Sequence, residues 1–373
     1  KPVEVTIPEL NQPKQRLYFI DIARSIAILL MLEGHFVHDS LALDLRDESN
    51  NIYYYWKFIR GFTSPVFLTV TGIVFTYLLL GNDKTAFWSN MRIRKGLKRV
   101  VELLFWGYLL QYYAFHVLQC IGVGILTIIS LYGIYRSIKV IPLWIYYATA
   151  GILLFTSYLY FGLLPEGQYW PAKAPMFIQN IFHGKHSLFP LTPHMGYTMF
   201  GAMIGVILFQ FKEKVKSPKF ILSGFVIGFV LYTFSKKFLL LLGDVSIFQN
   251  SNLYRMDWLF EKLGMVFMVL TILLCLETYV LKIKKQNLFL KIGQNTLSIY
   301  IIHMIVLYGS LTGRGLTHYF HERLNAYQIV PYTLLFVLTF VVFAYFIDQI
   351  RSVLSFILIP LKKLTNRLFF LFD

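Results

Sequence analysis

Apolar runs of about 20 residues recur from one end of this 373-residue sequence to the other, and they limit its fold more than any other feature. A helix of about 20 apolar residues is long enough to cross the roughly 30 Å hydrocarbon core of a bilayer. Only 14% of the residues are charged, whereas a soluble domain normally carries about a quarter. The sequence therefore predicts an all-α integral membrane protein, folded as one polytopic bundle of transmembrane helices.

Ten spans fit the sequence, and the third and fourth are so nearly continuous that a tight hairpin near His116 must separate them. We expect a transmembrane domain at 17–358, with cytosolic tails at 1–16 and 359–373. No cleavable signal peptide is visible in the polar opening stretch. The predicted spans are 17–37, 60–81, 97–117, 118–135, 141–162, 192–211, 219–242, 257–281, 292–310 and 329–350.

Lysine and arginine cluster in the segments between the apolar runs. With ten spans every basic cluster falls on one side, which holds roughly three quarters of the loop Lys and Arg, so that side is cytosolic. Both termini then face the cytosol. The same rule explains the net charge of +16, so we expect the lipid bilayer as a partner and no nucleic acid. Cys120 and Cys275 both lie in apolar runs, so neither a disulfide framework nor a metal site is expected.

The first predicted span carries ionisable residues, which are costly inside a membrane and are therefore functional candidates. Arg24 and His35 are eleven positions apart, so on a helix they are nearly eclipsed and about 16 Å apart along the axis. Asp21 and His38 fall within about 60° of the same line, whereas Glu33 points to the opposite side. The pattern predicts one polar stripe, with an Asp21–Arg24 pair at its cytosolic end and imidazoles at its outer end.

Such a stripe suits a ligand that lies along the helix, with its charged head near the cytosol and its reactive end at His35. Imidazole is the natural proton acceptor for an attacking amine or hydroxyl at neutral pH. Other interpretations stay open. The Asp21–Arg24 pair could simply order the bundle, His35 could be a hydrogen-bonded interior residue, and His38 could be solvated at the membrane interface.

A run of arginines and lysines leads directly into the third span. Positive-inside topology alone explains such a run. The alternative is a phosphate clamp, because several cations at the mouth of a membrane domain attract polyanionic groups. Coenzyme A carries such groups in its diphosphate and 3′-phosphate. The candidate phosphate-binding residues are Arg92, Arg94, Lys98 and Arg99.

The ninth span holds a second group of polar candidates. Thr296, Tyr300 and His303 repeat at i, i+4 and i+7, so they share one helix face, and Asn295 lies one position off that face. Polar groups placed in this way form either interhelical contacts or the wall of a cavity.

The outer loops supply the candidates for binding an acceptor. His194 lies at the outer mouth of the sixth span, on the same side as His35. Tyr169 and Trp170 lie in the longest outer loop, where a sugar could stack on them. Outer aromatic residues also form the interfacial belt that is common in membrane proteins, and this alternative stays open.

The segment from Asp21 to Met31, followed by His35, resembles the first catalytic-domain helix of heparan-α-glucosaminide N-acetyltransferase and its bacterial relatives. That family typically shows Asp-x-x-Arg-Gly-x-Ala-x-x-x-Met there. Three further segments are similar to the family and follow in its order. They are Ser64–Leu68 with Gly72, Val117–Gly122, and Gly293–Tyr300 with His303.

The resemblance implies acetyl-CoA as a co-substrate that enters from the cytosol, an amino sugar as acceptor on the far side, and a catalytic histidine near the outer end. We expect the coenzyme arm to run past Asp21 and Arg24 toward His35, with Asn295 and His303 lining the cavity. The family's catalytic histidine lies farther into the first outer loop, where this sequence has none, so the role passes by position to His35 or His38.

Two residues depart from the family pattern: Ser25 replaces the usual glycine, and Cys120 stands where a basic residue is common. The wider superfamily, which includes bacterial membrane O-acyltransferases, also has a histidine at the outer end of this helix, so an O-acyl acceptor stays open. The lysosomal enzyme has a large lumenal domain and a leading helix without counterparts here, and we therefore expect a bacterial plasma (inner) membrane.

The sequence predicts an acetyltransferase that moves an acetyl group from cytosolic acetyl-CoA to an amino sugar or glycan on the extracytoplasmic side. His35 would remove the proton as the acceptor attacks the thioester, and an acyl-histidine intermediate is the variant mechanism. The rivals are an O-acyltransferase acting on a cell-envelope glycan and a proton-coupled transporter that uses Asp21, Glu33 and the histidines. We see neither an inverted repeat nor paired broken helices to favour a transporter. A homodimer, and a chain that has lost its enzyme function, stay open.

Overall fold

The computed structural model describes residues 17–81, 85–162, 164–165, 167–245, 252–281 and 287–357. Every named element within these residues is a helix, and extended backbone pairs only in isolated bridges. The predicted all-α fold is therefore confirmed for this part of the chain. The two tails predicted at 1–16 and 359–373 lie outside the described residues.

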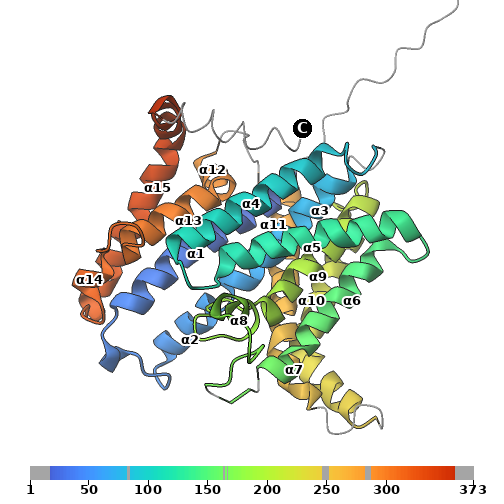
Figure 1. The fold of residues 1–373 in the computed structure, drawn as a ribbon, viewed down its shortest axis with the longest axis horizontal. Helices are drawn as coiled ribbons and strands as arrows, with labels where there is room; N and C mark the ends of the chain where they lie inside the picture. The colour runs from blue at the N-terminus through green and yellow to red at the C-terminus, as the bar shows by residue number, and fades with distance from the viewer. Residues whose placement is uncertain are drawn as a thin grey trace, which may run out of the picture.

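Long helices form the body of the bundle, with α15 and α14 at one edge and α6 and α7 toward the other (Figure 1). The long helices are α1 (Tyr18–Ser40), α3 (Thr63–Leu80), α4 (Met91–Leu110), α5 (Val117–Ile138), α6 (Leu143–Thr156), α9 (Leu191–Gln210), α10 (Pro218–Gly243), α11 (Asp257–Tyr279) and α15 (Ala326–Ile357). The shorter ones are η1 (Leu43–Leu45), α2 (Asn51–Arg60), α7 (Tyr158–Phe161), α8 (Met176–Phe182), η3 (Leu253–Met256), α12 (Leu288–Gln294), α13 (Thr296–His303), the π-helical turn η4 (Met304–Tyr308) and α14 (Thr317–Phe320).

Each of the ten predicted spans contains a helix, but the helices differ in how well they suit a bilayer. Seven helical segments are long and apolar enough to cross a membrane, or eight if the bent pair α12–α13 is one span, counted over the described residues. The first and third predicted spans, α1 and α4, are not among them because they carry more charged side chains. Ten crossings and cytosolic termini therefore remain predictions.

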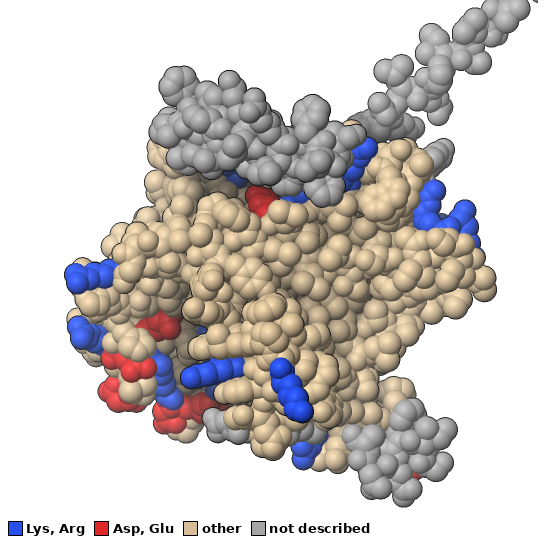
Figure 2. All heavy atoms as spheres, viewed as in Figure 1, with Lys and Arg blue, Asp and Glu red and all other residues tan. Residues whose placement is uncertain are grey.

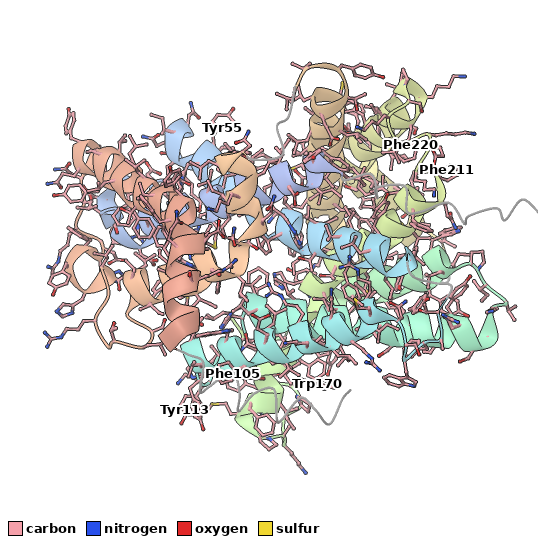
Figure 3. The ribbon with its side chains drawn as sticks, turned by 90° about the horizontal axis from the view of Figure 1, so that it is seen from above. Tyr55, Phe105, Tyr113, Trp170, Phe211 and Phe220 are labelled. Carbon is pink, nitrogen blue, oxygen red and sulfur yellow. The ribbon has the colours of Figure 1, made fainter. Side chains whose placement is uncertain are left out.

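The molecular surface is consistent with a membrane environment. Figure 2 shows that most of the middle of one face carries neither basic nor acidic side chains, and that charged groups gather toward its margins. Large aromatic side chains such as Tyr55, Phe105 and Phe211 are exposed and lie at the outside of the bundle (Figure 3). Exposed aromatic side chains are common in membrane proteins, where they lie at the interface with lipid.

Asparagine side chains start several of the helices. Asn50, Asn90 and Asn287 each accept a hydrogen bond of 2.9 Å from the backbone N–H two residues later, which satisfies a donor that the helix itself leaves unpaired. The cap at Asn90 makes α4 begin at Met91. The third span, predicted at 97–117, is therefore displaced toward the N-terminus, and the basic run belongs to the helix itself. The predicted hairpin is present, with His116 directly before α5.

Helices α3 and α9 pack with their backbones in contact. A Cβ atom on Gly72 would collide with the carbonyl oxygen of Thr198, and one on Gly201 would collide with that of Thr69. Small residues at such contacts are the usual means of bringing membrane helices close together. The pairing of α3 with α9 therefore depends on glycine at both positions.

The ninth predicted span is not the continuous helix that the sequence suggested. Helices α12 and α13 meet at Asn295 with a bend of 74°, and α13 continues directly into the π-helical turn η4. Helix α12 lies against α1, where Gly293 allows the approach and the Ser25 hydroxyl donates a hydrogen bond to the Phe289 carbonyl oxygen (2.5 Å). The bend lets α12 follow α1 while α13 turns toward the centre of the bundle.

Candidate active site

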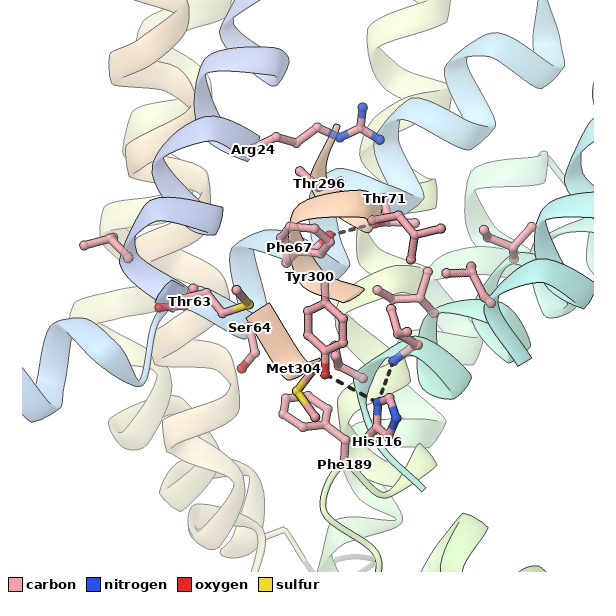
Figure 4. A pocket seen from close by; sticks show the side chains of 18 of the residues that line it. Arg24, Thr63, Ser64, Phe67, Thr71, His116, Phe189, Thr296, Tyr300 and Met304 are labelled. Atoms are coloured by element: carbon pink, nitrogen blue, oxygen red, sulfur yellow. Dashed lines mark hydrogen bonds between the residues drawn. The ribbon is translucent and has the colours of Figure 1, made fainter. Parts of the chain in front are cut away.

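A cavity of about 870 Å³ lies among α1, α3, α4, α5 and α13. Its volume is in the range of sites that hold a large organic ligand. Arg24 lies at one end of the view in Figure 4, and His116 and Phe189 lie at the other. We call these the inner end and the outer end, after the predicted cytosolic and extracytoplasmic sides. Arg24 and His35 both line the cavity, as their shared helix face predicted.

The inner end of the cavity is lined by four cations: Arg24, Arg92, Lys95 and Arg99. Arg24 lies 3.9 Å from Asp21, which does not itself line the cavity. Arg99 pairs with Glu102 at 2.8 Å, and both side chains are partly exposed. Guanidinium and ammonium groups gathered at one mouth bind phosphate oxygens well, because hydrogen bonds between charged partners are strong.

The predicted basic clamp is only partly at this mouth. Arg92 and Arg99 line the cavity, whereas Arg94 and Lys98 do not. The Arg94 guanidinium donates instead to the backbone carbonyl oxygen of Trp88 (3.1 Å). Lys95 takes its place, because positions 92, 95 and 99 share one face of an α-helix.

Two histidines from distant parts of the sequence meet at the outer end. Nδ1 of His35 lies 3.2 Å from Nε2 of His303, and the ring centroids are 5.3 Å apart. Nδ1 of His303 lies 2.6 Å from the backbone carbonyl oxygen of Tyr300. His303 is completely buried and does not line the cavity, so it contacts the cavity through His35.

Tyr308 completes the surroundings of His35. Its ring lies 6.1 Å from the ring of His35, and its hydroxyl donates to Oδ2 of Asp39 (2.7 Å). Tyr308 lines the cavity, and Asp39 lies behind it. Two aromatic side chains, from α13 and η4, thus enclose the imidazole of His35.

Three further cations, Lys57, Arg60 and Lys262, line the outer end. Arg60 donates a hydrogen bond to Nδ1 of His38 (3.0 Å), and Lys262 lies over the ring of Trp258 at 5.0 Å. His38 does not line the cavity. Of the two candidate catalytic histidines, His35 is therefore the one in position to contact a bound substrate.

The predicted acceptor-binding residues lie away from the cavity. Nδ1 of His194 donates to the backbone carbonyl oxygen of Pro190 (3.0 Å), and its ring lies 4.3 Å from that of Phe189, which does line the cavity. Trp170 packs with the rings of Phe161 and Phe182, and Tyr169 beside it does not line the cavity either. The structure does not bring these three side chains together with His35.

Of the candidate residues in the broken ninth span, some line the cavity and others do not. Thr296 and Tyr300 line the cavity. Asn295 lies at the bend, where its side-chain amide donates to the carbonyl oxygen of Lys291 (2.7 Å), and it does not line the cavity.

Comparison with known families decides which family the chain represents. A family model described as heparan-alpha-glucosaminide N-acetyltransferase, catalytic, matches residues 16–241, more than half of the chain. The chain belongs to this family. The search of curated proteins found no match.

The family match covers α1 through most of α10 and therefore includes the inner cations and His35. It ends before Asn295, Tyr300 and His303, although the segment that contains them resembles the family in sequence. The family is one of membrane-embedded acetyltransferases, and the apolar helices of this chain suit a membrane.

His116 is one of the cavity residues that sequence reasoning missed, since it was noted only as the position of the hairpin. It caps α5 together with Gln119, and its Nε2 lies 3.0 Å from the carbonyl oxygen of Gly107. The Tyr300 hydroxyl lies 3.5 Å from Nδ1 of His116, and Figure 4 marks this contact with a dashed line. The sequence did contain a signal for His116, because a histidine in a very short turn between two apolar runs is a candidate site residue.

No group of three or more His, Cys, Asp or Glu side chains is placed to hold a metal ion among the described residues. The two cysteines are free thiols. Cys120 is fully buried in the core and Cys275 is half-buried, as expected for residues that contribute to packing.

Proposed function

We propose that this chain transfers an acetyl group from cytosolic acetyl-CoA to an amino sugar or glycan on the extracytoplasmic side of a bacterial plasma membrane. The observation that carries the proposal is one continuous cavity that is lined by Arg24, Arg92, Lys95 and Arg99 at one end and by His35 toward the other. Family membership supports the reaction class, and the cavity supports the arrangement of the two substrates within it.

The inner cations suit the phosphates of coenzyme A. Arg92, Lys95 and Arg99 lie in the N-terminal half of α4, and Arg24 lines the same end of the cavity from α1. Arg24 and His35 are eleven positions apart on α1, which corresponds to about 16 Å of helix. A substrate anchored by its phosphates at this mouth would extend its pantetheine arm and thioester along α1 toward His35.

His35 acts as the general base in this proposal. The acceptor nitrogen attacks the thioester carbonyl carbon, a C–N bond forms and the C–S bond breaks. His35 takes the proton from the nitrogen and returns it to the departing coenzyme A thiolate, so protons and charge balance. A hydroxyl acceptor would follow the same steps with a new C–O bond, and the site as described suits either acceptor.

A transporter is the second candidate, because one observation favours it. The bent pair α12–α13 is a discontinuous helix, and such helices often form ion and substrate sites in transporters. Transporters normally have two such broken helices, one in each of two corresponding halves. The described residues of this chain contain one bent pair.

The test uses purified protein in detergent with isotope-labelled acetyl-CoA and a panel of amino sugars and short glycans. Mass spectrometry would identify acetylated products for the native chain, for His35→Ala and for His318→Ala. His318 is a matched control because it lies on α14 and does not line the cavity. We expect a product that disappears in His35→Ala and persists in His318→Ala, with acetyl-CoA binding unchanged in both. If acetyl-CoA is neither bound nor consumed with any acceptor, the transferase proposal is wrong and the transporter is favoured.

A further inference from the structure

The hydrogen bonds around His303 determine which of its two ring nitrogens carries a proton. Nδ1 lies 2.6 Å from the Tyr300 carbonyl oxygen, and a carbonyl oxygen can only accept a hydrogen bond. Nδ1 of His303 is therefore the protonated nitrogen. The ring is completely buried, and burial away from water disfavours a charged imidazolium. Neutral His303 then has an unprotonated Nε2 that can only accept.

The same reasoning extends to His35. Its Nδ1 lies 3.2 Å from Nε2 of His303, so Nδ1 of His35 must donate the hydrogen bond that joins the two rings. In a neutral imidazole the other nitrogen then carries the lone pair. That nitrogen, Nε2 of His35, lies across the ring from His303 and belongs to a residue that lines the cavity.

We infer that His303 is a positioning residue, which holds His35 as its Nδ1–H tautomer and leaves Nε2 free to accept a proton from the substrate. The catalytic part of this inference rests on the proposed function, in which His35 is the general base. The tautomer of His35 can be measured without any reaction. A base whose second nitrogen is fixed by a further group is a recurrent arrangement in acyl transfer, because it sets both the orientation and the tautomer of the ring.

The local backbone explains how His303 is brought to His35. His303 ends α13, and the π-helical turn η4 follows it directly as far as Tyr308. Residues five apart on an α-helix point about 140° away from each other, whereas the i→i+5 hydrogen bonding of a π-helix brings them nearer to one face. The rings of both His303 and Tyr308 accordingly contact the ring of His35, at 5.3 and 6.1 Å between centroids.

A purely structural role for His303 makes a different prediction. If the residue only fills space in the core, replacements of similar size should behave alike whether or not they carry a hydrogen-bond acceptor. If it positions His35, a replacement that keeps an acceptor should retain function better than one that does not. His303→Gln keeps a carbonyl oxygen that can accept from Nδ1 of His35, and His303→Leu removes the acceptor.

The experiment measures the tautomer of His35 by NMR of protein labelled with ¹⁵N-histidine in detergent, with His35→Ala used to assign the signal. We expect the Nδ1–H tautomer in the native chain and in His303→Gln, and a loss of that preference in His303→Leu. The Nε2–H tautomer in the native chain would overturn the inference, because His303 would then be the donor in the shared hydrogen bond.

The second readout is the kcat and the KM for labelled acetyl-CoA, measured for the native chain, His303→Leu and His303→Gln. His303→Leu should lower kcat by about 100-fold or more, the usual contribution of a positioned general base, while the KM for acetyl-CoA changes little. His303→Gln should recover a substantial part of that loss. Equal kcat values for the Gln and Leu variants would overturn the positioning role. If the native chain acetylates no acceptor but shows the expected tautomer, the proposed function fails and the assignment of the hydrogen bonds stands.

Discussion

The two ends of the cavity differ in how firmly their side chains are held. At the inner end, Arg24 lies 3.9 Å from its acidic partner, and Arg99 is paired but partly exposed. At the outer end, His35 is joined to the buried His303, and Tyr308 is hydrogen-bonded to Asp39. The inner ion pairs each join residues of one helix, whereas the outer contacts join α1 to α13 and η4 and so hold the outer side chains from two helices.

This difference indicates a division of labour within one cavity. Several cations at one mouth attract a large polyanionic group, so substitutions among them should change binding. Fixed imidazole and phenol groups hold a reacting atom in one geometry, so substitutions there should change turnover. The predictions below test this separation, from the largest expected effect to the smallest.

Removing two inner cations should give a large effect on binding alone. We expect Arg92→Ala combined with Arg99→Ala to raise the KM for acetyl-CoA by about 100-fold or more, because each hydrogen bond to a charged group contributes about 1.5–3 kcal/mol. The kcat should stay within about threefold of the native value. Steady-state kinetics with varied acetyl-CoA measures both constants, and Arg94→Ala is the comparison because Arg94 does not line the cavity. A fall in kcat at unchanged KM would contradict the division between the two ends.

Replacing His116 should affect stability more than chemistry. His116→Ala removes the cap of α5, and the loss of a side-chain cap costs about 0.5–2 kcal/mol. His116→Asn should lose less, because asparagine is a good capping residue. Thermal unfolding in detergent would measure the difference between the two variants. A large loss of turnover in His116→Ala without a lower melting temperature would assign His116 to the reaction itself and widen the catalytic group at the outer end.

The smallest effect is expected where α1 meets α12. The Ser25 hydroxyl donates to the carbonyl oxygens of Phe289 and Asp21, so Ser25→Ala should lower the free energy of unfolding by about 1 kcal/mol. Ser25→Gly, which restores the residue usual in the family, should act in the same direction. A clear change in acetyl-CoA affinity in either variant would show that this contact also shapes the inner end.

The arrangement of α1 was predictable because it depends on local geometry. Residue spacing on a helix fixes which side chains share a face, and Arg24 and His35 both line the cavity as expected. Glu33 was predicted to point the other way, and it accepts a hydrogen bond from the indole N–H of Trp56 (2.7 Å) instead of lining the cavity. Long apolar runs indicated the helical fold for the same reason, since their length is a local property.

Contacts between distant segments were not predictable from spacing. His35 and His303 are 268 positions apart, and their contact depends on the bend at Asn295, for which the sequence showed no proline. The omission of Lys95 from the predicted clamp, and the inclusion of Arg94 and Lys98, have a simpler cause. The third span was predicted to begin at 97, so the basic run was treated as a loop and its helical face was not considered. Lys262 lines the cavity through tertiary packing of α11, which no local pattern indicates.

The backbone contact between α3 and α9 has a consequence for how substrate preference can change in evolution. Phe67, Thr71 and Phe75 on α3 line the cavity, while Gly72 on the same helix rests against α9. Because no side chains separate the two backbones, this wall has little room to retreat. A relative that accepts a longer acyl chain would therefore gain space by trimming side chains on α3 or by shifting α4 and α5, and the chain length that each relative accepts should be readable from those side chains.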